Sequence, residues 1–357
     1  MQIRKIREKI DNIDKKIVEL ISKRAELIKK IAEIKKKKKL SIYVPGREKE
    51  VYQKICKYNT GPLPDGYLKN IYREIMSASL ALEKELTIAY LGPPATFTHL
   101  AALKKFGSAV NYIECSNITE IFTEVEKGNA DFGVVPIENS IEGAVSHTLD
   151  MFIDSELKIC SEVYLEITHY LLSREKDLSR VKKIYSNPQV FGQCRRWLEK
   201  NMPQVELVEV SSTARAAQIA SREPKSGCIA SKMAKDIYKL NVLASSIEDV
   251  PCNITRFLVV GKTLAEPTGC DKTSIMFSVK DRVGALHDML TPFKKYNINL
   301  TKIESRPSKR KVWDYYFFVD LEGHYKDNNV RQALTELEKY ASYLKILGSY
   351  PKAEEVS

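Results

Sequence analysis

The feature that most constrains this chain is a long stripe of apolar side chains near its N-terminus, interrupted by one arginine. The stripe advances in steps of three and four residues: Ile3, Ile6, Ile10, Ile13, Ile17, Leu20, Leu27, Ile31 and Ile34. That heptad spacing is typical of a long helix packed against other helices. The stripe position after Leu20 holds Arg24. Because an unpaired guanidinium is costly in a helical core, we expect Arg24 to face an anion.

Two further cations, Arg7 and Lys35, lie at the edge of the same face. Arg24 and Lys35 are separated by about 16 Å along a helix axis, so their long side chains could grip one small molecule. Arg7 lies about 25 Å from Arg24 and reaches that molecule only from an antiparallel partner helix. Surface ion pairs at Arg7 and Lys35 are the alternative. Two short helices cannot cover so long a stripe, so we expect a second chain.

The positive charge is concentrated in the first part of the chain. Residues 1–86 carry 22 Lys and Arg against 12 Asp and Glu, and the remainder carries 35 against 34. A basic arm suits nucleic acid, an acidic membrane surface or an anionic small substrate. Seven scattered cysteines without a Cys-x-x-Cys pair indicate reduced thiols and predict no metal site. With no signal peptide or membrane-spanning run in view, we predict a cytoplasmic protein.

The apolar pattern divides the chain into three parts. Residues 1–86 predict helices only. Residues 87–262 alternate short apolar runs with helical segments, which predicts a largely parallel α/β sheet in two lobes with a ligand crevice. After a linker at 263–271, residues 272–351 follow the β-α-β-β-α-β order of an α+β ferredoxin-like module.

Several polar segments of the first part resemble the all-helical chorismate mutase family. They are Arg7-Glu8-Lys9-Ile10, Lys23-Arg24-Ala25-Glu26-Leu27, Lys35 and Arg47-Glu48. That family is an intertwined dimer in which three helices per chain form two sites. Its reaction, the rearrangement of chorismate to prephenate, needs no nucleophile and no cofactor. It requires only a held conformation and stabilised negative charge on the ether oxygen.

The resemblance implies a role for each polar residue of this part. Arg7 would reach the partner's site, while Arg24 and Arg47 would bind the substrate carboxylates. Lys35 would donate to the breaking ether oxygen, and Glu48 would take the substrate hydroxyl. The remaining polar positions of the last helix are Ser79 and Glu83.

Two residues depart from the usual mutase pattern. Val44 stands where an aspartate is common, so one hydroxyl contact is missing or is supplied by backbone. Glu83 stands where many relatives have glutamine. Because a carboxylate would repel the ether oxygen, we hypothesise that buried Glu83 works protonated.

Three islands of polar residues mark the ends of predicted strands in the second part. They are Gly92-Pro93-Pro94-Ala95-Thr96-Phe97-Thr98, Val135-Pro136-Ile137-Glu138-Asn139-Ser140-Ile141-Glu142-Gly143 and Asn253-Ile254-Thr255-Arg256-Phe257. The first offers backbone N–H groups to an anion. Each alone is a weak signal, because Asn and Ser at strand ends usually form turns.

Together the islands closely resemble prephenate dehydratase, over essentially all of residues 87–262. That family has two lobes similar to periplasmic binding proteins and converts prephenate to phenylpyruvate by decarboxylation with loss of hydroxide. The resemblance implies that Thr255 is the principal catalytic residue, that Arg256 binds a substrate carboxylate, and that Glu138 is a candidate proton source. Asn187 stands where the family usually has histidine. Further cleft residues implied by the resemblance are Thr96, Thr98, Asn139, Ser140, Gln189, Gln193, Ser212 and Thr213.

Two segments of the third part resemble the ACT regulatory domain of phenylalanine-making dehydratases. They are Gly284-Ala285-Leu286-His287 and Glu304-Ser305-Arg306-Pro307. In that family the two motifs face each other across a dimer interface and bind phenylalanine, and Asn299 and Leu300 would complete the pocket here. Inhibition requires only that phenylalanine bind the less active state better. Taken alone, Gly284-Ala285 is an ordinary strand-to-helix turn.

We therefore predict a bifunctional enzyme of phenylalanine biosynthesis, an isomerase and a lyase in one homodimeric or dimer-based chain. We expect no metal, cofactor, nucleic acid or membrane partner. Three alternatives remain: a non-catalytic binding protein, a nucleic-acid-binding arm on a sensor, and a variant that acts on arogenate. The lack of a secretory signal counts against the first, Arg24 in the stripe against the second, and the fused mutase against the third.

Overall fold

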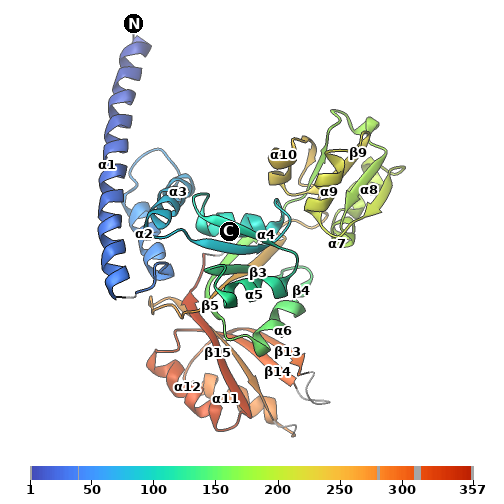
Figure 1. The fold of residues 1–357 in the computed structure, drawn as a ribbon. Coiled ribbons are helices and arrows are strands. Elements are labelled where there is room, and N and C mark those ends of the chain that lie inside the picture. Colours follow the sequence, from blue (N-terminus) through green and yellow to red (C-terminus); the bar gives the residue numbers. More distant parts are fainter. Residues whose placement is uncertain (1, 39, 280–281, 309–314, 355–357) are drawn as a thin grey trace. The chain divides into compact units, whose positions relative to one another are not determined.

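The long N-terminal stripe folds as one helix of 37 residues, α1 (Gln2–Lys38). The structure is a computed structural model that describes residues 2–38, 40–279, 282–308 and 315–354. The chain forms two compact units: a helical unit that holds Met1–Thr87 together with Lys105–Asn111, and a second unit with the remaining residues. Figure 1 labels the elements of both. Among the described helices, none is both long and apolar enough to cross a membrane.

The helical unit consists of three helices, as the sequence predicts. Helix α2 (Pro45–Tyr58) begins with proline, whose missing N–H and fixed φ suit the first turn of a helix. Helix α3 (Asp65–Glu83) packs against both α1 and α2. The lysines that end α1 lie in its last turn, where cations interact favourably with the helix dipole.

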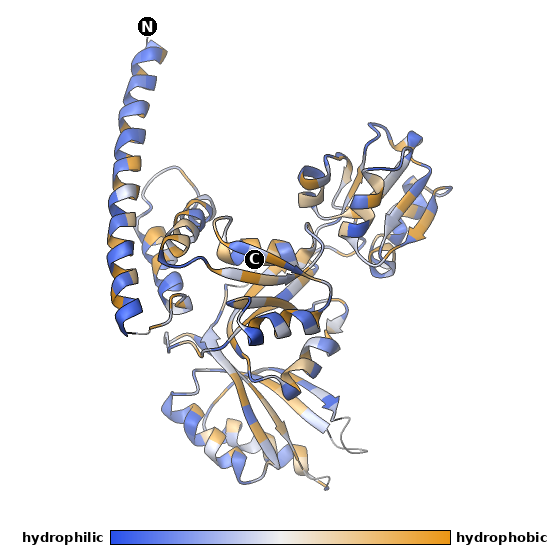
Figure 2. Ribbon diagram, viewed as in Figure 1, coloured by the Kyte–Doolittle hydropathy of each residue, from blue (hydrophilic) through white to orange (hydrophobic). Residues whose placement is uncertain are grey.

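The apolar stripe of α1 is uncovered in the single chain. Its nine Ile and Leu side chains are 43–70% exposed, and Figure 2 shows apolar residues repeating along the whole helix. Arg24 and Lys35, in contrast, are half-buried and turn toward α3. An apolar surface of this length marks an interaction site, so the prediction that a second chain covers the stripe stays open.

The first α/β lobe is built on a mixed sheet with the strand order β2-β1-β3-β11-β5. The strands are β1 (Thr87–Leu91), β2 (Asn111–Cys115), β3 (Phe132–Asn139), β5 (Lys158–Glu166) and β11 (Ile254–Gly261), with β4 (Gly143–Ala144) beside β3. Its helices are α4 (Phe97–Phe106), α5 (Ile118–Lys127) and α6 (Ser146–Asp154). Strand β11 runs antiparallel to both neighbours. This corrects the prediction of a largely parallel sheet, because the chain returns after the second lobe to fill the place between β3 and β5.

The second lobe is a five-stranded sheet with the order β10-β6-β9-β7-β8. Its strands are β6 (Tyr170–Ser173), β7 (Lys183–Ser186), β8 (Glu206–Glu209), β9 (Ser226–Ala230) and β10 (Asn241–Ser245). Its helices are η1 (Leu178–Arg180), α7 (Pro188–Gln193), α8 (Arg195–Asn201), α9 (Thr213–Ala220) and α10 (Lys232–Tyr238). Strand β7 is parallel to β8 and β9, and β6 is antiparallel to β9 and β10.

The C-terminal module has the predicted order β-α-β-β-α-β and a four-stranded sheet, β13-β14-β12-β15. Its elements are β12 (Asp271–Ser278), α11 (Ala285–Lys295), β13 (Leu300–Pro307), β14 (Tyr315–Glu322), α12 (Asn328–Glu338) and β15 (Tyr343–Pro351). All its paired strands are antiparallel. Residues of α11 and α12 form one apolar core with the sheet.

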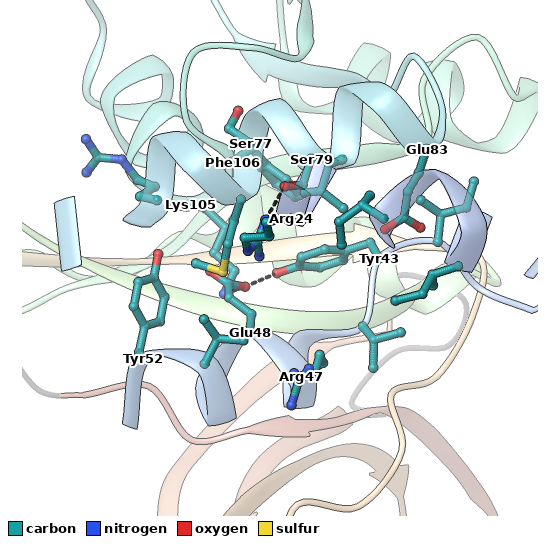
Figure 3. Close-up of a pocket in the computed structure, with 18 of the residues that line it drawn as sticks. Arg24, Tyr43, Arg47, Glu48, Tyr52, Ser77, Ser79, Glu83, Lys105 and Phe106 are labelled. Carbon is teal, nitrogen blue, oxygen red and sulfur yellow. Dashed lines mark hydrogen bonds and ion pairs between the residues drawn. The ribbon is translucent and has the colours of Figure 1, made fainter. Parts of the chain in front are cut away.

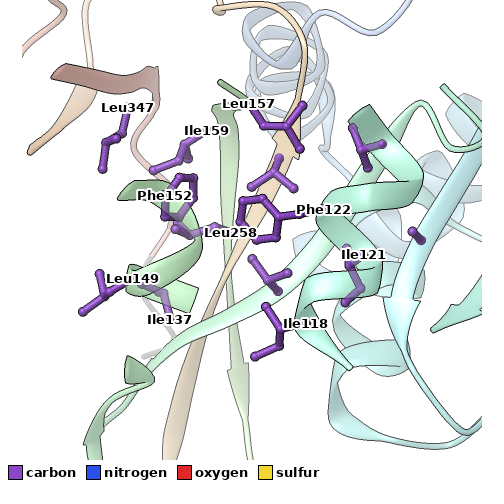
Figure 4. Packing of buried hydrophobic residues seen from close by; sticks show 14 of the residues in the cluster. Ile118, Ile121, Phe122, Ile137, Leu149, Phe152, Leu157, Ile159, Leu258 and Leu347 are labelled. Atoms are coloured by element: carbon purple, nitrogen blue, oxygen red, sulfur yellow. The ribbon is translucent and has the colours of Figure 1, made fainter. Parts of the chain in front are cut away.

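A second apolar core joins this module to the first lobe. Phe122, Phe152 and Leu258 of the lobe belong to one buried cluster with Phe318 and Leu347 of the module; Figure 4 shows the packing around Phe122 and Phe152. Strand β15 approaches β5 so closely that a Cβ at Gly348 would lie 2.2 Å from the carbonyl oxygen of Ile159. The contact therefore requires glycine at that position.

A cluster of buried charges lies at the same junction. Arg256 of β11 is 3% exposed, and its guanidinium contacts the carboxylates of Glu138 (2.8 Å), Glu162 (2.8 Å) and Asp320 (2.5 Å). A second cation, Lys272, lies 2.9 Å from Glu162. Burial alone would raise the pKa of Asp320, but the charge of Arg256 and a hydrogen bond from a serine hydroxyl hold it below its usual value.

Replacing Arg256 with methionine is expected to lower the free energy of unfolding by about 3–5 kcal/mol, because it leaves buried carboxylates without their shared cation. Asp320→Asn should cost less, since the amide still accepts a hydrogen bond and Arg256 keeps two carboxylates. Urea unfolding at neutral pH measures both. An Arg256→Met protein as stable as the wild type would contradict this account.

The same cluster predicts a pH dependence. The folded-state pKa of Asp320 is lowered, so its stabilising contribution is present above the ordinary carboxyl range and is lost as pH falls through the folded value. The gap in stability between the wild type and Asp320→Asn should therefore narrow as pH falls from neutral to about pH 3. If the difference in stability between the wild type and Asp320→Asn grew as pH fell, the stabilising role of ionised Asp320 would be contradicted.

Candidate functional sites

A cavity of about 360 Å³ opens among the three helices of the helical unit (Figure 3). Its charged lining residues are Arg24, Lys35, Arg47, Glu48, Arg73, Glu83 and Lys105. The excess of cations over carboxylates suits an anionic ligand of small size. Arg7 does not line this cavity, in keeping with the expectation that it serves a site of another chain.

Arg24 enters the cavity from α1. Its Nη1 donates to Oγ of Ser79 at 2.5 Å, and that hydroxyl donates in turn to the carbonyl of Ile75. Burial lowers the pKa of Arg24, and the positive charge of Arg47 lowers it further. Among the contacts of the described residues, no carboxylate pairs with Arg24. The anion expected from the sequence is therefore not supplied by a side chain of this unit.

Lys35 holds two oxygen atoms at the other end of the cavity. Its Nζ lies 2.8 Å from Oε2 of Glu83 and 2.8 Å from the carbonyl oxygen of Ile42. An ammonium group at this distance forms an ion pair with a carboxylate. Glu83 and the carbonyl of Ile42 therefore orient the Lys35 ammonium at the edge of the cavity, and the hypothesis that Glu83 works protonated stays a prediction.

One carboxylate oxygen of Glu48 on α2 contacts both a hydroxyl and an ammonium group. The hydroxyl of Tyr43 lies 2.9 Å from Oε2, and Nζ of Lys105 lies 2.8 Å from the same atom. The carbonyl of Val44 accepts the N–H groups of Arg47 and Glu48 in the first turn of α2. The backbone carbonyl at Val44 is thus already used by the helix.

A polar network lies where strands β3 and β11 end. Asn139 and Thr255 are directly opposite in the ladder, and Nδ2 of Asn139 donates to Oγ1 of Thr255 at 2.8 Å and to Oδ1 of Asn253 at 2.6 Å. Oδ1 of Asn139 accepts the backbone N–H groups of Ile141 and Glu142. These two bonds fix the amide orientation, so Thr255 must be the acceptor from Asn139.

The network continues to Gln193 on α7 of the second lobe. Its amide donates to Glu142 at 2.7 Å, and its Oε1 lies 2.8 Å from Nε2 of His169 and 3.4 Å from Nδ2 of Asn253. Burial lowers the pKa of His169, so the imidazole is neutral near pH 7 and donates through Nε2. A cavity of about 490 Å³ lined by Gln189, Gln193 and Asn253 adjoins this network.

Two predicted cleft residues lie on the opposite face of the strands. Glu138 and Arg256 are paired in the ladder next to Asn139 and Thr255, and neighbouring residues of a strand point to opposite faces. Arg256 is enclosed by carboxylates of its own chain, so its role as a substrate ligand stays a prediction. Burial would raise the pKa of Glu138, but Lys302 and Arg256 lower it overall, and its role as a proton source also stays a prediction.

Several other predicted cleft hydroxyls hold the backbone in place. Thr96 donates to the carbonyl of Leu91, Ser140 accepts the N–H of Ile254, and Ser212 caps the N-terminus of α9. Asn187 caps α7 in the same way. Thr98 and Thr213 are buried. These contacts agree with the turn-forming alternative for such residues, and a further role in binding remains a prediction.

The two predicted motifs of the C-terminal module lie on separate elements. Gly284 has a left-handed φ of +78° and precedes α11, which carries Ala285, Leu286 and His287. Glu304, Ser305 and Arg306 lie on the edge strand β13, and Asn299 and Leu300 lie at its start. In the described part of the chain, no hydrogen bond or ion pair joins the first motif to the second. Their meeting across a dimer therefore stays a prediction.

Strand β13 instead contacts the first lobe. Nζ of Lys302 lies 2.6 Å from Oε2 of Glu138, and Arg306 lies 3.2 Å from Asp150 of α6. Both cations belong to one face of the strand, since they are an even number of residues apart. The strand that carries the second predicted motif thus contacts the β3–β11 pair through Glu138.

Sequence reasoning missed four residues of these sites: Tyr43, Lys105, Asn253 and His169. Asn253 had a signal, because it belongs to the same polar island as Thr255. Tyr43 lies one position before the residue at which the mutase pattern was broken. Lys105 and His169 had no local signal, since their contacts are with residues distant in sequence.

Comparison with known proteins gives three family matches in chain order. Residues 6–84 match chorismate mutase type II, residues 88–264 match prephenate dehydratase, and residues 273–339 match the ACT domain. A protein of Aquifex aeolicus named bifunctional chorismate mutase/prephenate dehydratase is 52% identical over 99% of this chain and 98% of its own. A Pseudomonas aeruginosa protein of the same name is 48% identical over 87% of this chain and 86% of its own.

The fold also matches a solved structure. Prephenate dehydratase from Arthrobacter aurescens in complex with L-Phe is 35% identical in sequence, with a TM-score of 0.70. The match covers 75% of this chain and 90% of that one.

Proposed function

The chain belongs to the bifunctional chorismate mutase/prephenate dehydratase family, and from that premise we propose how its parts divide the two reactions and their control. The helical unit rearranges chorismate to prephenate, the two α/β lobes convert prephenate to phenylpyruvate, and phenylalanine bound at the C-terminal module inhibits. The family, the three-part fold and both activities predicted from the sequence are confirmed by the comparisons. One observation supports the division of labour: apart from Lys105, the charged residues of the helical cavity fall inside the chorismate mutase match, and the Thr255–Asn139 network falls inside the prephenate dehydratase match.

The mutase reaction uses the cation-lined cavity of the helical unit. Arg24 and Arg47 bind the two carboxylates of chorismate, and Lys35 donates to the ether oxygen on which negative charge develops. Glu48 accepts the substrate hydroxyl. Lys35 stabilises charge that appears only as the ether bond breaks, and the other groups hold the compact conformer, so no covalent step is needed.

The dehydratase reaction uses the hydroxyl of Thr255. Because Thr255 accepts from Asn139, its own hydrogen is available to the leaving hydroxyl of prephenate. A threonine hydroxyl does not ionise near neutral pH, so it assists by hydrogen bonding to the leaving group, while decarboxylation and aromatisation drive the loss of hydroxide. Asn139, Asn253 and Gln193 hold this hydroxyl and link it to the second lobe.

A second copy of the chain covers the apolar stripe of α1. The stripe comprises nine apolar positions that are exposed in the single chain, and Arg7 lies on the same helix outside the cavity. An antiparallel partner helix buries both stripes and brings the partner's Arg7 to the site. This arrangement makes mutase activity depend on the dimer.

Phenylalanine control acts through β13. The Glu304-Ser305-Arg306 segment lies on the strand whose Lys302 holds Glu138, and Glu138 is adjacent to Asn139 in β3. A ligand that shifts β13 in the less active state alters the residues behind the Thr255–Asn139 pair. The L-Phe complex of the Arthrobacter dehydratase supports phenylalanine as the ligand.

Thr255→Ala is expected to reduce prephenate turnover by about a hundredfold or more, as for loss of a positioned hydrogen bond to charge that develops in the transition state. Thr255→Ser should keep most of the turnover because it retains the hydroxyl. Stopped assays of phenylpyruvate formation measure both, and chorismate turnover by the same protein reports correct folding. Near-normal dehydratase turnover in Thr255→Ala would refute the assignment.

Ile13→Asp is expected to convert the dimer to monomers and to abolish chorismate turnover, while prephenate turnover persists. Light scattering after gel filtration and the two activity assays measure this. Lys15→Asp is the matched control, because Lys15 lies about 200° around α1 from Ile13 and outside the stripe. A fully active mutase in a monomeric Ile13→Asp protein would show that each site is complete within one chain.

Phenylalanine is expected to slow prephenate consumption by the wild type, and Lys302→Met should weaken this inhibition while calorimetry still shows phenylalanine binding. Lys295→Met is the control, because Lys295 pairs with Glu336 inside the module. Chorismate and prephenate consumption, each with and without phenylalanine, test the whole proposal. Equal inhibition of Lys302→Met and the wild type would exclude the route through β13.

A further inference from the structure

A short segment of the dehydratase match is built into the helical unit. Residues 105–111 lie within the prephenate dehydratase match and outside the chorismate mutase match, which ends at residue 84. They nevertheless form one compact unit with residues 1–87. Lys105 and Phe106, the last two residues of α4, line the cation-rich cavity.

The segment is anchored on α3 by specific contacts. Glu74 accepts the N–H and hydroxyl of Ser108 at 3.0 and 2.6 Å, and Oγ of Ser77 accepts the N–H of Ala109 at 3.0 Å. Gly107 has φ of +70°, and a Cβ there would lie 2.6 Å from Cβ of Ser77. The close approach therefore requires glycine, and it sets the position of the two residues that precede it.

Lys105 reaches the carboxylate that the mutase reaction needs. Its Nζ lies 2.8 Å from Oε2 of Glu48, and both side chains are mostly buried, 16% and 13% exposed. The ammonium also lies 5.9 Å from the ring centroid of Tyr43, within reach of a cation–π contact, and Tyr43 packs on Phe106 at 5.2 Å. Ion pairs on the exposed surface contribute little to stability, whereas this pair is largely enclosed beside the cavity.

The Tyr43 hydroxyl and the Lys105 ammonium contact the same oxygen atom of Glu48. Tyr43 and Lys105 both contact Oε2, and in the described part of the chain Oε1 receives no side-chain donor. Oε1 is therefore the atom left to accept a hydrogen bond from a bound molecule. The arrangement fixes the carboxylate plane and places a cation where a dianion binds.

We propose that Lys105 is a positioning residue of the chorismate mutase site, supplied by the segment assigned to the dehydratase. Together with Tyr43 it holds Glu48 so that Oε1 faces the substrate hydroxyl, and it offsets the negative charge that Glu48 would otherwise present to the substrate. This inference rests on the assignment of the cavity to the mutase reaction. Chorismate turnover then depends on a residue beyond the mutase match, whereas prephenate turnover does not depend on it.

The test uses the full chain with Lys105→Met, Lys105→Arg and Lys104→Met. Lys105→Met should lower kcat for chorismate by about tenfold to a hundredfold with a smaller change in KM, as for loss of a largely buried ion pair that orients Glu48. Lys105→Arg should restore part of the rate. Lys104, whose Nζ donates to the carbonyl of Tyr164, is the matched control and should leave chorismate turnover unchanged. Prephenate turnover in each protein reports folding.

A double mutant separates positioning from simple packing. In a Glu48→Gln background, Lys105→Met should cause little further loss, because the group that Lys105 positions is already changed. Tyr43→Phe removes the other donor to the same oxygen without altering charge, and it should lower kcat in the same direction by a smaller factor. Additive losses in Glu48→Gln, or unchanged kcat in Lys105→Met, would overturn the inference.

Arg24→Ala tests the assignment of the cavity separately from the role of Lys105. If Arg24→Ala abolishes chorismate turnover while Lys105→Met does not affect it, the cavity is the mutase site and only the role of Lys105 is wrong. If Arg24→Ala keeps chorismate turnover, the assignment of the cavity itself fails. A Lys105→Met protein that loses both activities would show a structural role and would also overturn the inference.

Discussion

Side-chain alternation along β11 constrains the dehydratase lobes and the C-terminal module together. Thr255 and Arg256 are neighbours, so one faces the network with Asn139 and the other faces the junction with the module. Strand β3 repeats the division, with Asn139 opposite Thr255 and Glu138 opposite Arg256. The Thr255 hydroxyl and the charged junction thus lie on opposite faces of the same two strands. The control that we propose would need no separate chain of contacts, because Thr255 and Arg256 share backbone.

Two buried cations of this protein, Arg256 and Arg24, differ in whether carboxylates of the chain surround them. Arg256 is surrounded by carboxylates of its own chain, which offset the cost of desolvation and make it a fixed part of the core. Arg24 donates to a serine, no carboxylate pairs with it among the described residues, and its pKa is lowered by burial. A half-buried cation without a counter-ion is a candidate ligand-binding group. The stability of the fold would improve if Arg24 were apolar, so its presence is best explained by a ligand.

Local patterns in the sequence were enough to predict the three parts and the long helix of the first arm. They did not show which face of a strand each residue occupies. The resemblance implied that Thr255 and Arg256 both serve the cleft, whereas alternation points their side chains to opposite faces of β11. The antiparallel insertion of β11 was also missed, because short apolar runs do not specify strand direction. Tyr43 and Lys105 escaped notice because their importance arises from contact with Glu48 and not from any spacing of their own.

The limits of the family matches and the limits of the compact units do not coincide, and Gly107 explains why. A residue with a side chain at this position would push the chain away from Ser77, and the contacts of Ser108 and Ala109 with α3 would be lost. With glycine there, α4 ends against the mutase cavity instead of in solvent. Helix α4 consequently carries a predicted dehydratase residue, Thr98, in its first turn and a mutase-cavity residue, Lys105, in its last. Under the proposed assignment of this cavity, the mutase site includes residues from the segment matched to prephenate dehydratase, which a simple tether between independent domains would not supply.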